Sequence, residues 1–448
     1  MDLGTEARPP TLARRHVLAA TLGNALEFYD FLTYAFFSIQ IGHAFFPAQS
    51  AYGSLMLSLA AFGSGFVTRP LGALVIGSFS DRVGRRPAMI LSYALMGGSI
   101  VALAVIPPYA AIGVAAPVLA ILVRMIQGFS LGGEVGSNTA FLMEAASPRR
   151  RGLIVSWQGA SQYIASAAAS LVGLTLTRVL APHAFEAYGW RIAFLIGALT
   201  LPFGLWLRRS LPETLHQPET VRHQAREGEG RLLTAWRHRR VIVLGLLVLG
   251  AGTIGTYIFE YIATYAQATL HMRAASGFAA ELAGYTLSVG ALLLGGWLSD
   301  RIGRRPVNIG ANLALLVLAY PVFLWITTTR TDLALVVGVG LLTTVANFPG
   351  GAFYAALSES LPKTIRGGGF AVVYAVSVAS LGGTTQLVVT WLIHVTGNPI
   401  APAWYLVGAT AVGQVALLLM PESAPVKSRD RTVAIAEPAI PAAPSLVP

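Results

Sequence analysis

Long apolar runs separated by short polar connectors make up most of this chain. Runs of about twenty aliphatic and aromatic residues recur between positions 17 and 420, and that is the length a helix needs to cross a bilayer. We therefore predict an all-α membrane protein. Twelve spans are predicted, at residues 17–45, 53–79, 87–107, 112–143, 152–180, 190–208, 241–269, 277–298, 306–327, 332–360, 368–395 and 401–420.

One connector is much longer than the others. Residues 209–240 are rich in Arg, Glu and His, and they divide the spans into a six-helix half at 17–208 and another at 241–420. The remaining segments are a short N-terminal stretch, 1–16, and a Pro- and Ala-rich tail, 421–448, which we expect to be disordered. Twelve spans place both ends of the chain on one side of the membrane.

A ten-residue pattern links the two predicted halves. Gly-x-x-x-Asp-Arg-x-Gly-Arg-Arg occurs at 77–86 and again at 296–305, each time on the polar loop that ends an apolar run. A repeat of this length, in a chain with the composition of an integral membrane protein, is typical of secondary transporters built from two related bundles.

Charge placement gives an orientation. Of 31 Lys and Arg residues, 25 lie on the predicted side of the N-terminus, which the positive-inside rule makes cytoplasmic. The net charge of +11 could suggest nucleic acid, but these bases sit on short connectors and not on a folded basic surface. The exceptions are four residues on the outer side and two within spans: Arg178, Arg191, Arg273 and Arg330, then Arg69 and Arg124.

Several classes of protein are disfavoured. The first apolar run carries Glu27 and Asp30 and lacks a small-residue cleavage site, so we expect no cleaved signal peptide. The chain has no cysteine, which excludes disulfides and thiol chemistry. Neither a zinc-spaced His cluster nor a phosphate-cradling loop is present, so we expect no enzyme activity, no cofactor and no metal.

The repeated pattern resembles that of the major facilitator superfamily. Within it, three further motifs resemble the metabolite:proton symporters, and Trp157-Gln-Gly-Ala-Ser161-Gln162 is most similar to citrate and tricarballylate members. The three motifs are Gly23-Asn24-x-x-Glu27-Phe-Tyr-Asp30-Phe31, Arg69-Pro70-Leu-Gly72 and Arg124-x-x-Gln127-Gly-x-Ser-x-Gly-Gly-Glu134.

This resemblance implies a monomeric, proton-coupled importer in a bacterial inner membrane. It would carry a small organic acid, a citrate-like tricarboxylate or a dicarboxylate, by alternating access. Two alternatives stay open: a carrier of a zwitterionic osmolyte of the betaine type, and a membrane sensor that does not transport.

Ionisable side chains inside a bilayer are costly, so each is a functional candidate. Glu27 and Asp30 lie about 18 and 22 Å beyond Arg15 at 1.5 Å per residue, which places them near mid-membrane. Together with Glu134 they are the candidates for carrying the proton. The resemblance implies that Asp30 and Arg124 form the coupling pair; the alternative is a permanent ion pair that locks two helices.

Substrate contacts are expected from arginines and neutral donors. Arg124 falls at mid-depth in the fourth span, and Arg69 does so in the second, where its planar fork suits a carboxylate. A structural partnership of Arg69 with Glu27 or Glu134 stays open, as do interhelical hydrogen bonds for the fifth-span amides and aromatic-belt positions for the tyrosines. The other candidates are Asn24, Tyr34, Gln127, Gln158, Ser161, Gln162, Tyr257 and Tyr261.

The repeated loops are interpreted as gates. Their acids can cap a neighbouring helix, and their arginines can pair with Glu144 or Glu359 when the inner side is shut. We assign this role to Gly77, Asp81, Arg82, Gly84, Arg85, Arg86, Glu144 and Arg151 in the first half, and to Gly296, Asp300, Arg301, Gly303, Arg304, Arg305, Glu359 and Arg366 in the second.

Overall fold

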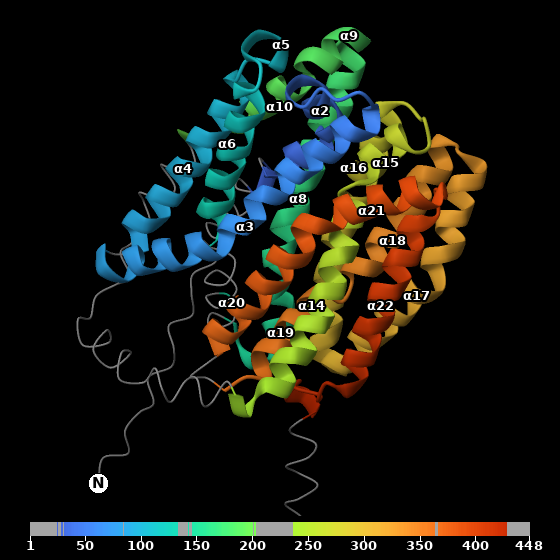
Figure 1. Ribbon diagram of the computed structural model, residues 1–448. Helices are drawn as coiled ribbons and strands as arrows, with labels where there is room; N and C mark the ends of the chain where they lie inside the picture. The colour runs from blue at the N-terminus through green and yellow to red at the C-terminus, as the bar shows by residue number, and fades with distance from the viewer. Residues whose placement is uncertain are drawn as a thin grey trace, which may run out of the picture.

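The computed structural model consists of packed helices (Figure 1). It describes residues 25, 28–29, 31–83, 85–132, 142, 146–199, 201–202, 236–362 and 366–427. All regular structure in these ranges is helical. This agrees with the predicted fold class, because a chain that must satisfy its own backbone polar groups in hydrocarbon can do so within helices.

The first half contributes the blue to green elements of Figure 1. Its long helices are α3, α4, α6 and α8, and short elements join them. The bounds are α2 Ser38–Phe45, α3 Ala51–Val83, α4 Arg85–Val105, α5 Tyr109–Ile112, α6 Ala115–Leu131, η1 Pro148–Arg150, α8 Arg151–Val179, α9 Pro182–Ala184, η2 Phe185–Gly189 and α10 Trp190–Ala198.

The second half contributes the yellow to red elements. Its bounds are α14 Arg239–Phe259, α15 Ile262–Ala268, α16 Ala274–Ile302, α17 Arg304–Thr329, α18 Asp332–Asn347, α19 Gly350–Glu359, α20 Arg366–Ser377, η3 Val378–Gly382, α21 Gly383–Thr396 and α22 Ala401–Leu419.

Eight stretches in the described part of the chain are long and apolar enough to cross a membrane. Their bounds follow the predicted spans closely: the run predicted at 277–298 is helical over Ala274–Ile302, and that at 401–420 over Ala401–Leu419. Charged residues and clusters of Gly or Pro at the ends of the apolar runs predicted these helix ends well. A helix leaves the apolar layer where its sequence becomes polar.

Two predicted spans of the second half are each divided into two α-helices. The run at 241–269 divides into α14 and α15 at Glu260 and Tyr261. The run at 332–360 divides into α18 and α19 at Phe348 and Pro349, where proline has no backbone N–H to continue the ladder. Apolar composition cannot reveal such breaks, because both pieces keep the same hydropathy.

At the second copy of the repeated pattern, the polar loop is shorter than predicted. Helix α16 runs through Asp300 to Ile302, and α17 begins at Arg304. Gly303 alone separates them, with φ of 107°, a left-handed conformation that glycine adopts without strain. The second copy of the pattern therefore lies almost entirely in two helices that meet at a sharp corner.

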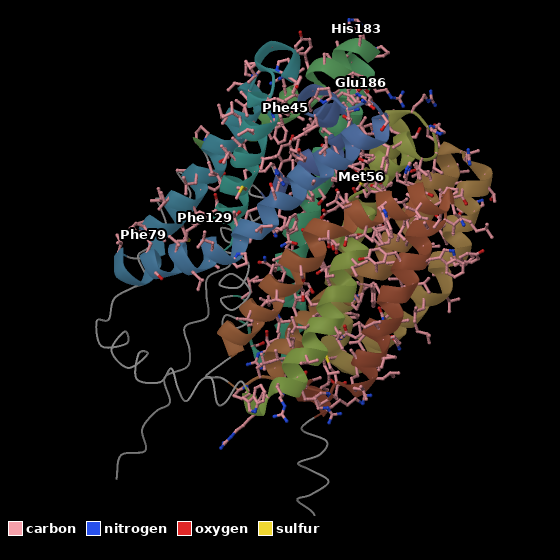
Figure 2. The ribbon with its side chains drawn as sticks, in the orientation of Figure 1. Phe45, Met56, Phe79, Phe129, His183 and Glu186 are labelled. Atoms are coloured by element: carbon pink, nitrogen blue, oxygen red, sulfur yellow. The ribbon has the colours of Figure 1, made fainter. Side chains whose placement is uncertain are left out.

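The bundle has two ends. We call the end where α3 meets α4 and α16 meets α17 the repeat-loop end, and the opposite one the far end. Figure 2 shows Phe79 of α3 toward the first and both His183 and Glu186 at the second. Arg178, Arg191, Arg273 and Arg330, the four arginines predicted on the outer side, all lie at the far ends of their helices.

Candidate functional site

Glycines allow α3 and α6 to pack backbone against backbone, and this contact positions both mid-span arginines. A Cβ at Gly128 would lie 1.6 Å from the carbonyl oxygen of Gly65, and one at Gly132 would lie 2.0 Å from that of Arg69. The helices can approach this closely only without side chains at these positions. Arg69 of α3 and Arg124 of α6 both lie along this contact between the two helices.

Arg124 is fully buried among aromatic rings. Its exposed fraction is 0%, and its guanidinium lies 4.5 Å from the ring centre of Tyr34 and 4.9 Å from that of Phe62. Nη1 donates a hydrogen bond of 2.6 Å to Oε1 of Gln127. Nε and Nη2 have no hydrogen-bond partner among the described residues. A buried cation is costly without an anion, and the described residues give Arg124 none, so this site calls for an anionic partner.

Arg69 occupies the neighbouring part of the same aromatic cluster. Its guanidinium lies 4.2 Å from the ring centre of Phe66 and 4.5 Å from that of Phe31. Phe31 also contacts Arg124 at 4.8 Å, so the two guanidinium groups pack on one ring. Nε and Nη2 of Arg69 likewise lack a partner in the described part of the chain.

The three acids predicted to carry the proton, Glu27, Asp30 and Glu134, lie outside the described residues, as does Asn24. Tyr34 is described, and it stands one helical turn beyond Asp30 in the sequence. Its hydroxyl donates to the carbonyl oxygen of Ser58 at 3.2 Å, and its ring faces Arg124.

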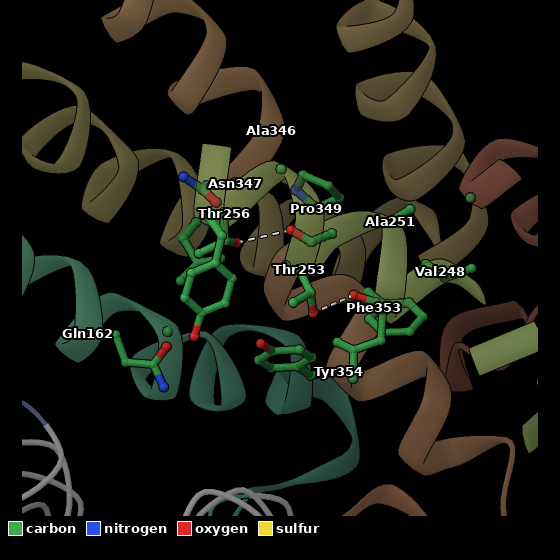
Figure 3. Close-up of a pocket in the computed structure, with 18 of the residues that line it drawn as sticks. Gln162, Val248, Ala251, Thr253, Thr256, Ala346, Asn347, Pro349, Phe353 and Tyr354 are labelled. Atoms are coloured by element: carbon green, nitrogen blue, oxygen red, sulfur yellow. Dashed lines mark hydrogen bonds between the residues drawn. The ribbon is translucent and has the colours of Figure 1, made fainter. Parts of the chain in front are cut away.

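A cavity of about 150 Å³ lies between the halves and within the second half (Figure 3). Phe28 and Gln162 from the first half and Thr256, Asn347 and Tyr354 from the second are among its lining residues. Neither Arg69 nor Arg124 is among them. Tyr257 and Glu260 connect the two regions, because both line the cavity and both interact electrostatically with Arg69.

One wall of the cavity is braced by a hydrogen bond between the halves and by another within the second half. The hydroxyl of Tyr163 donates to Oδ1 of Asn347 at 2.5 Å, and Nδ2 of Asn347 donates to Ser288 at 3.0 Å. Tyr163 also stacks on Tyr285, with ring centres 5.9 Å apart. No group of three or more His, Cys, Asp or Glu that could hold a metal occurs in the described ranges.

The predicted neutral donors divide into two groups. Gln162 and Tyr257 line the cavity, and Nε2 of Gln162 has no partner among the described residues. Gln158, Ser161 and Tyr261 are buried but are not among its lining residues. The hydroxyl of Ser161 donates to the carbonyl oxygen of Gln158, and that of Tyr261 accepts from Thr390 at 2.8 Å.

Two buried acids in the second half are the main departure from the sequence reasoning. Glu260 stands about 30 Å beyond Arg240 at 1.5 Å per residue, which suggests a place at the rim of the membrane, yet it is only 6% exposed. Glu281 is 1% exposed and was not singled out, because it is a lone acid near the end of an apolar run. The signal that could have found it is its place inside a predicted span, where any acid is a candidate.

At the repeat-loop end, the second copy of the pattern joins the two halves. Asp300 accepts hydrogen bonds from the backbone N–H groups of Gly152 and Leu153 at 2.8 and 3.0 Å, at the start of α8. Arg304 pairs with Asp300 at 2.7 Å and with Glu359 at 3.2 Å. A Cβ at Gly296 would lie 2.6 Å from the carbonyl oxygen of Gly152, so α8 and α16 also touch through backbone.

Further residues complete this network. Arg151 of α8 lies 3.8 Å from Glu359. Glu422 accepts from the backbone N–H groups of Arg304 and Arg305 at 2.9 and 3.0 Å, and so caps the start of α17. Arg301 instead packs on the ring of Trp297, 3.9 Å from its centre.

The first copy of the pattern is described only in part. Gly77 belongs to α3, and a Cβ there would meet nothing within 4 Å among the described atoms, unlike one at Gly296. Gly84, Glu144 and the side chains of Asp81, Arg82, Arg85, Arg86 and Arg366 lie outside the described residues.

Toward the far end, different contacts join the halves. A Cβ at Gly63 would lie 2.7 Å from the carbonyl oxygen of Gly383, so α3 and α21 approach closely. Gln40 donates to Glu186 at 3.0 Å and to Gln267 at 3.3 Å. Partial burial would raise the pKa of Glu186, but polar contacts with His43 and Gln40 outweigh it and lower that pKa below its ordinary value.

Comparison with known proteins agrees with this architecture. The family model of the Major Facilitator Superfamily matches residues 20–384. The chain is 36% identical over 411 residues to the citrate-proton symporter of Salmonella typhi, covering 90% of this chain and 93% of the relative. It is 30% identical over 424 residues to the proline/betaine transporter of Salmonella typhimurium, covering 92% and 84% respectively.

Solved structures show the same fold. A crystal structure of a D-xylose-proton symporter superposes with a TM-score of 0.74 at 20% identity, covering 92% of this chain and 97% of the other. The family model spans most of the chain, and both relatives cover it almost completely. The chain belongs to the major facilitator superfamily, whose members are membrane transporters and not enzymes.

Proposed function

We propose that the chain is a proton-coupled importer of a small organic acid, a citrate-like tricarboxylate or failing that a dicarboxylate. The observation that carries this proposal is the environment of Arg124, which is fully buried and has two guanidinium nitrogens without a partner in the described part of the chain. A carboxylate fits those donors through bidentate hydrogen bonds. The 36% identity to a citrate-proton symporter supports the same substrate class.

Arg69 extends the site toward the cavity. Because Arg69 and Arg124 share the ring of Phe31, one small molecule with several carboxylates can reach both. Tyr257, Glu260 and Gln162 then face the remaining polar groups from the cavity side. Each charge of the substrate needs a partner or a proton in a poorly hydrated site, which ties uptake of a polyanion to protons.

The alternative substrate is a betaine-type osmolyte, which the similarity to a proline/betaine transporter favours. Aromatic rings such as Phe31, Tyr34 and Phe62 are the usual cage for a quaternary ammonium. Here the guanidinium groups already lie over those ring faces. A third cation would meet two arginines, so the arrangement favours an anion.

The proton step is assigned to the first span, with Asp30 as the principal carrier and Glu27 and Glu134 as alternatives. Asp30 is predicted to share a helix face with Tyr34. The ring of Tyr34 faces Arg124. An arginine beside a carboxylate stabilises its charged form, and diversion of that arginine to a bound anion favours protonation. Substrate binding and proton uptake are thereby linked.

The repeat-loop end is proposed to be cytoplasmic, with both termini on that side of a bacterial inner membrane. The four arginines predicted on the outer side lie at the far end, and the arginine-rich corners lie at the other, as the positive-inside rule requires. The six-helix halves at 17–208 and 241–420 rock about the central site. The contacts of Asp300 and Glu359 at one end, and of Gly63 and Gln40 at the other, act as the gates of a monomeric carrier.

A transport panel in proteoliposomes with an imposed pH gradient tests this function. We expect saturable uptake of radiolabelled citrate that rises as the external pH falls, with competition by tricarballylate. Empty liposomes and an uncoupler provide the controls. Accumulation of a betaine or a neutral sugar, with no entry or competition by citrate, tricarballylate or 2-oxoglutarate, would exclude the proposed substrate class.

A further inference from the structure

Two carboxyl groups are buried near each other where α14, α15 and α16 meet, and the proton step assigned to the first span does not use them. Glu260 lies at the break between α14 and α15, and Glu281 lies two turns into α16. Glu281 accepts a hydrogen bond from the backbone N–H of Ala263, three residues after Glu260, and the charge of Glu260 acts on it. Both side chains are more than nine-tenths buried.

Glu281 is held by two weak or neutral donors. Oε1 accepts from the backbone N–H of Ala263 at 2.9 Å, and Oε2 lies 3.4 Å from the hydroxyl of Ser170 on α8. Neither partner carries a charge. A protonated carboxyl group keeps both contacts, with its carbonyl oxygen accepting from Ala263 and its hydroxyl turned toward Ser170.

Glu260 is the member of the pair that faces the cavity. It lines the cavity wall, and its Oε2 has no hydrogen-bond partner among the described residues. Arg69 of α3 is the cation that faces it. The other titratable groups facing the pair are Tyr163 on α8, Tyr257 on α14, Tyr285 on α16 and Tyr374 on α20.

One cation cannot balance two buried carboxylates. Like charges at close range disfavour double ionisation, and a buried charge without a partner is strongly destabilising. Among the described residues, Arg69 is the cation that acts on Glu260, whereas the donors to Glu281 are neutral. Of the two, Glu281 is therefore the one that carries a proton while Arg69 faces Glu260.

We propose that Glu260 and Glu281 form a second proton-binding site in the C-terminal half, in which Glu281 keeps one proton and Glu260 gains another when Arg69 is drawn to an anion. The proton enters from the cavity and binds the free Oε2 of Glu260. The link to transport rests on the proposed function, because the anion that would occupy Arg69 is the substrate carboxylate. The site itself rests only on the contacts of the two acids.

Infrared spectroscopy of the full-length reconstituted protein tests the site without any substrate. Protonated carboxyl groups give a C=O stretching band that carboxylates lack. At neutral pH we expect this band in the wild type and its loss in Glu281→Gln, whose amide still accepts from Ala263. Asp332→Asn is the matched control, since Asp332 is an acid of the same half that is 55% exposed and paired with Arg273.

A second pair of variants isolates Glu260. Arg69→Gln removes its cation, so we expect an additional protonated-carboxyl band that disappears in the double variant Arg69→Gln, Glu260→Gln. Variants are compared only where their size-exclusion profiles and melting temperatures match those of the wild type. If Glu281→Gln does not fold, Glu281→Asp replaces it and should retain the protonated-carboxyl band at a shifted frequency. An unchanged band in Glu281→Gln, or no Glu260-dependent band after removal of Arg69, overturns the proposal.

Transport then measures the consequence. With citrate as the probe, the proton-to-citrate ratio obtained from reversal potentials should fall by one in Glu260→Gln and stay unchanged in Asp332→Asn. Wild-type protein that moves no citrate contradicts the proposed function while the infrared result still decides the site. Wild-type symport with an unchanged ratio in Glu260→Gln contradicts the role of the site in coupling alone.

Discussion

Asp300 of the second half accepts a hydrogen bond of 2.8 Å from the backbone N–H of Gly152 in the first half. The same carboxylate accepts from Leu153, so it binds two of the free N–H groups that begin α8. A negative charge at a helix N-terminus is favourable, and this one also pairs with Arg304. One side chain thus connects the two halves and organises the corner between α16 and α17.

Asp300→Asn should weaken closure of the repeat-loop end. Asparagine offers one acceptor oxygen and no charge, and hydrogen bonds to charged groups contribute about 1.5–3 kcal/mol. A change of this size shifts the balance between open and closed states by about tenfold or more. Because the chain has no cysteine, spin labels at Val83 and Trp236 can report the opening by distance measurement.

Turnover should fall while equilibrium citrate binding stays near the wild-type value, because the substitution biases states and leaves the central site intact. Asp332→Asn, which removes an exposed acid at the far end, is the matched control. Lost affinity with an unchanged distance distribution would contradict the gating role.

Arg124→Lys should weaken citrate binding by about tenfold or more although the positive charge is kept. An ammonium group lacks the planar fork that holds a carboxylate through two parallel hydrogen bonds, and it cannot keep the contact with Gln127 at the same time. Binding is measured by calorimetry on purified protein. Arg273→Lys, at a residue whose side chain is 82% exposed, provides the control, and near-normal affinity in Arg124→Lys would argue against direct contact.

Asp30→Asn should abolish accumulation of citrate driven by a pH gradient and leave some citrate exchange. Asparagine preserves the shape of the side chain but cannot bind or release the coupled proton. Uphill uptake and counterflow are measured in the same proteoliposomes. If uphill uptake persists in Asp30→Asn, the principal proton carrier is Glu27 or Glu134, and the same two assays on Glu27→Gln and Glu134→Gln identify it.

The sequence predicted the helices well because hydropathy records burial in lipid directly. The ends of the spans at 277–298 and 401–420 agree with α16 and α22 within about four residues. The same reasoning missed the break at Glu260 and Tyr261. Both sides of that break are apolar, and the freed N–H of Ala263 is satisfied by a residue 18 positions away.

Depth along a helix could be counted from the sequence, but what covers a residue could not. Glu260 lies far from Arg240 along the chain, which suggests a rim, yet it is buried in the cavity wall and interacts electrostatically with Arg69 and Tyr163 of the other half. Glu281 was missed for the same reason, since its neighbours Ser170 and Ala263 come from other helices. Contacts between halves depend on helix rotation, which a periodic apolar pattern leaves undetermined.

Two glycines hold the halves together at different levels of the bundle. Gly63 of α3 meets the backbone of Gly383 toward the far end, and Gly296 of α16 meets the backbone of Gly152 toward the repeat-loop end. A side chain at either position must push the opposing backbone away. The two sites should therefore bias the carrier in opposite directions.

Gly63→Val should open the far end, and Gly296→Val should open the repeat-loop end. Overpacking costs about 1–3 kcal/mol, which corresponds to a shift of roughly fivefold to over a hundredfold between states. Spin-label distances between Tyr188 and Leu333 should lengthen in the first variant, and those between Val83 and Trp236 in the second. Gly310→Val, at a position with nothing described within 4 Å of its Cβ, should change neither distance. If both variants lengthened the same one of these two distances, the contacts would be static packing between the halves. Alternating access would then depend on other residues.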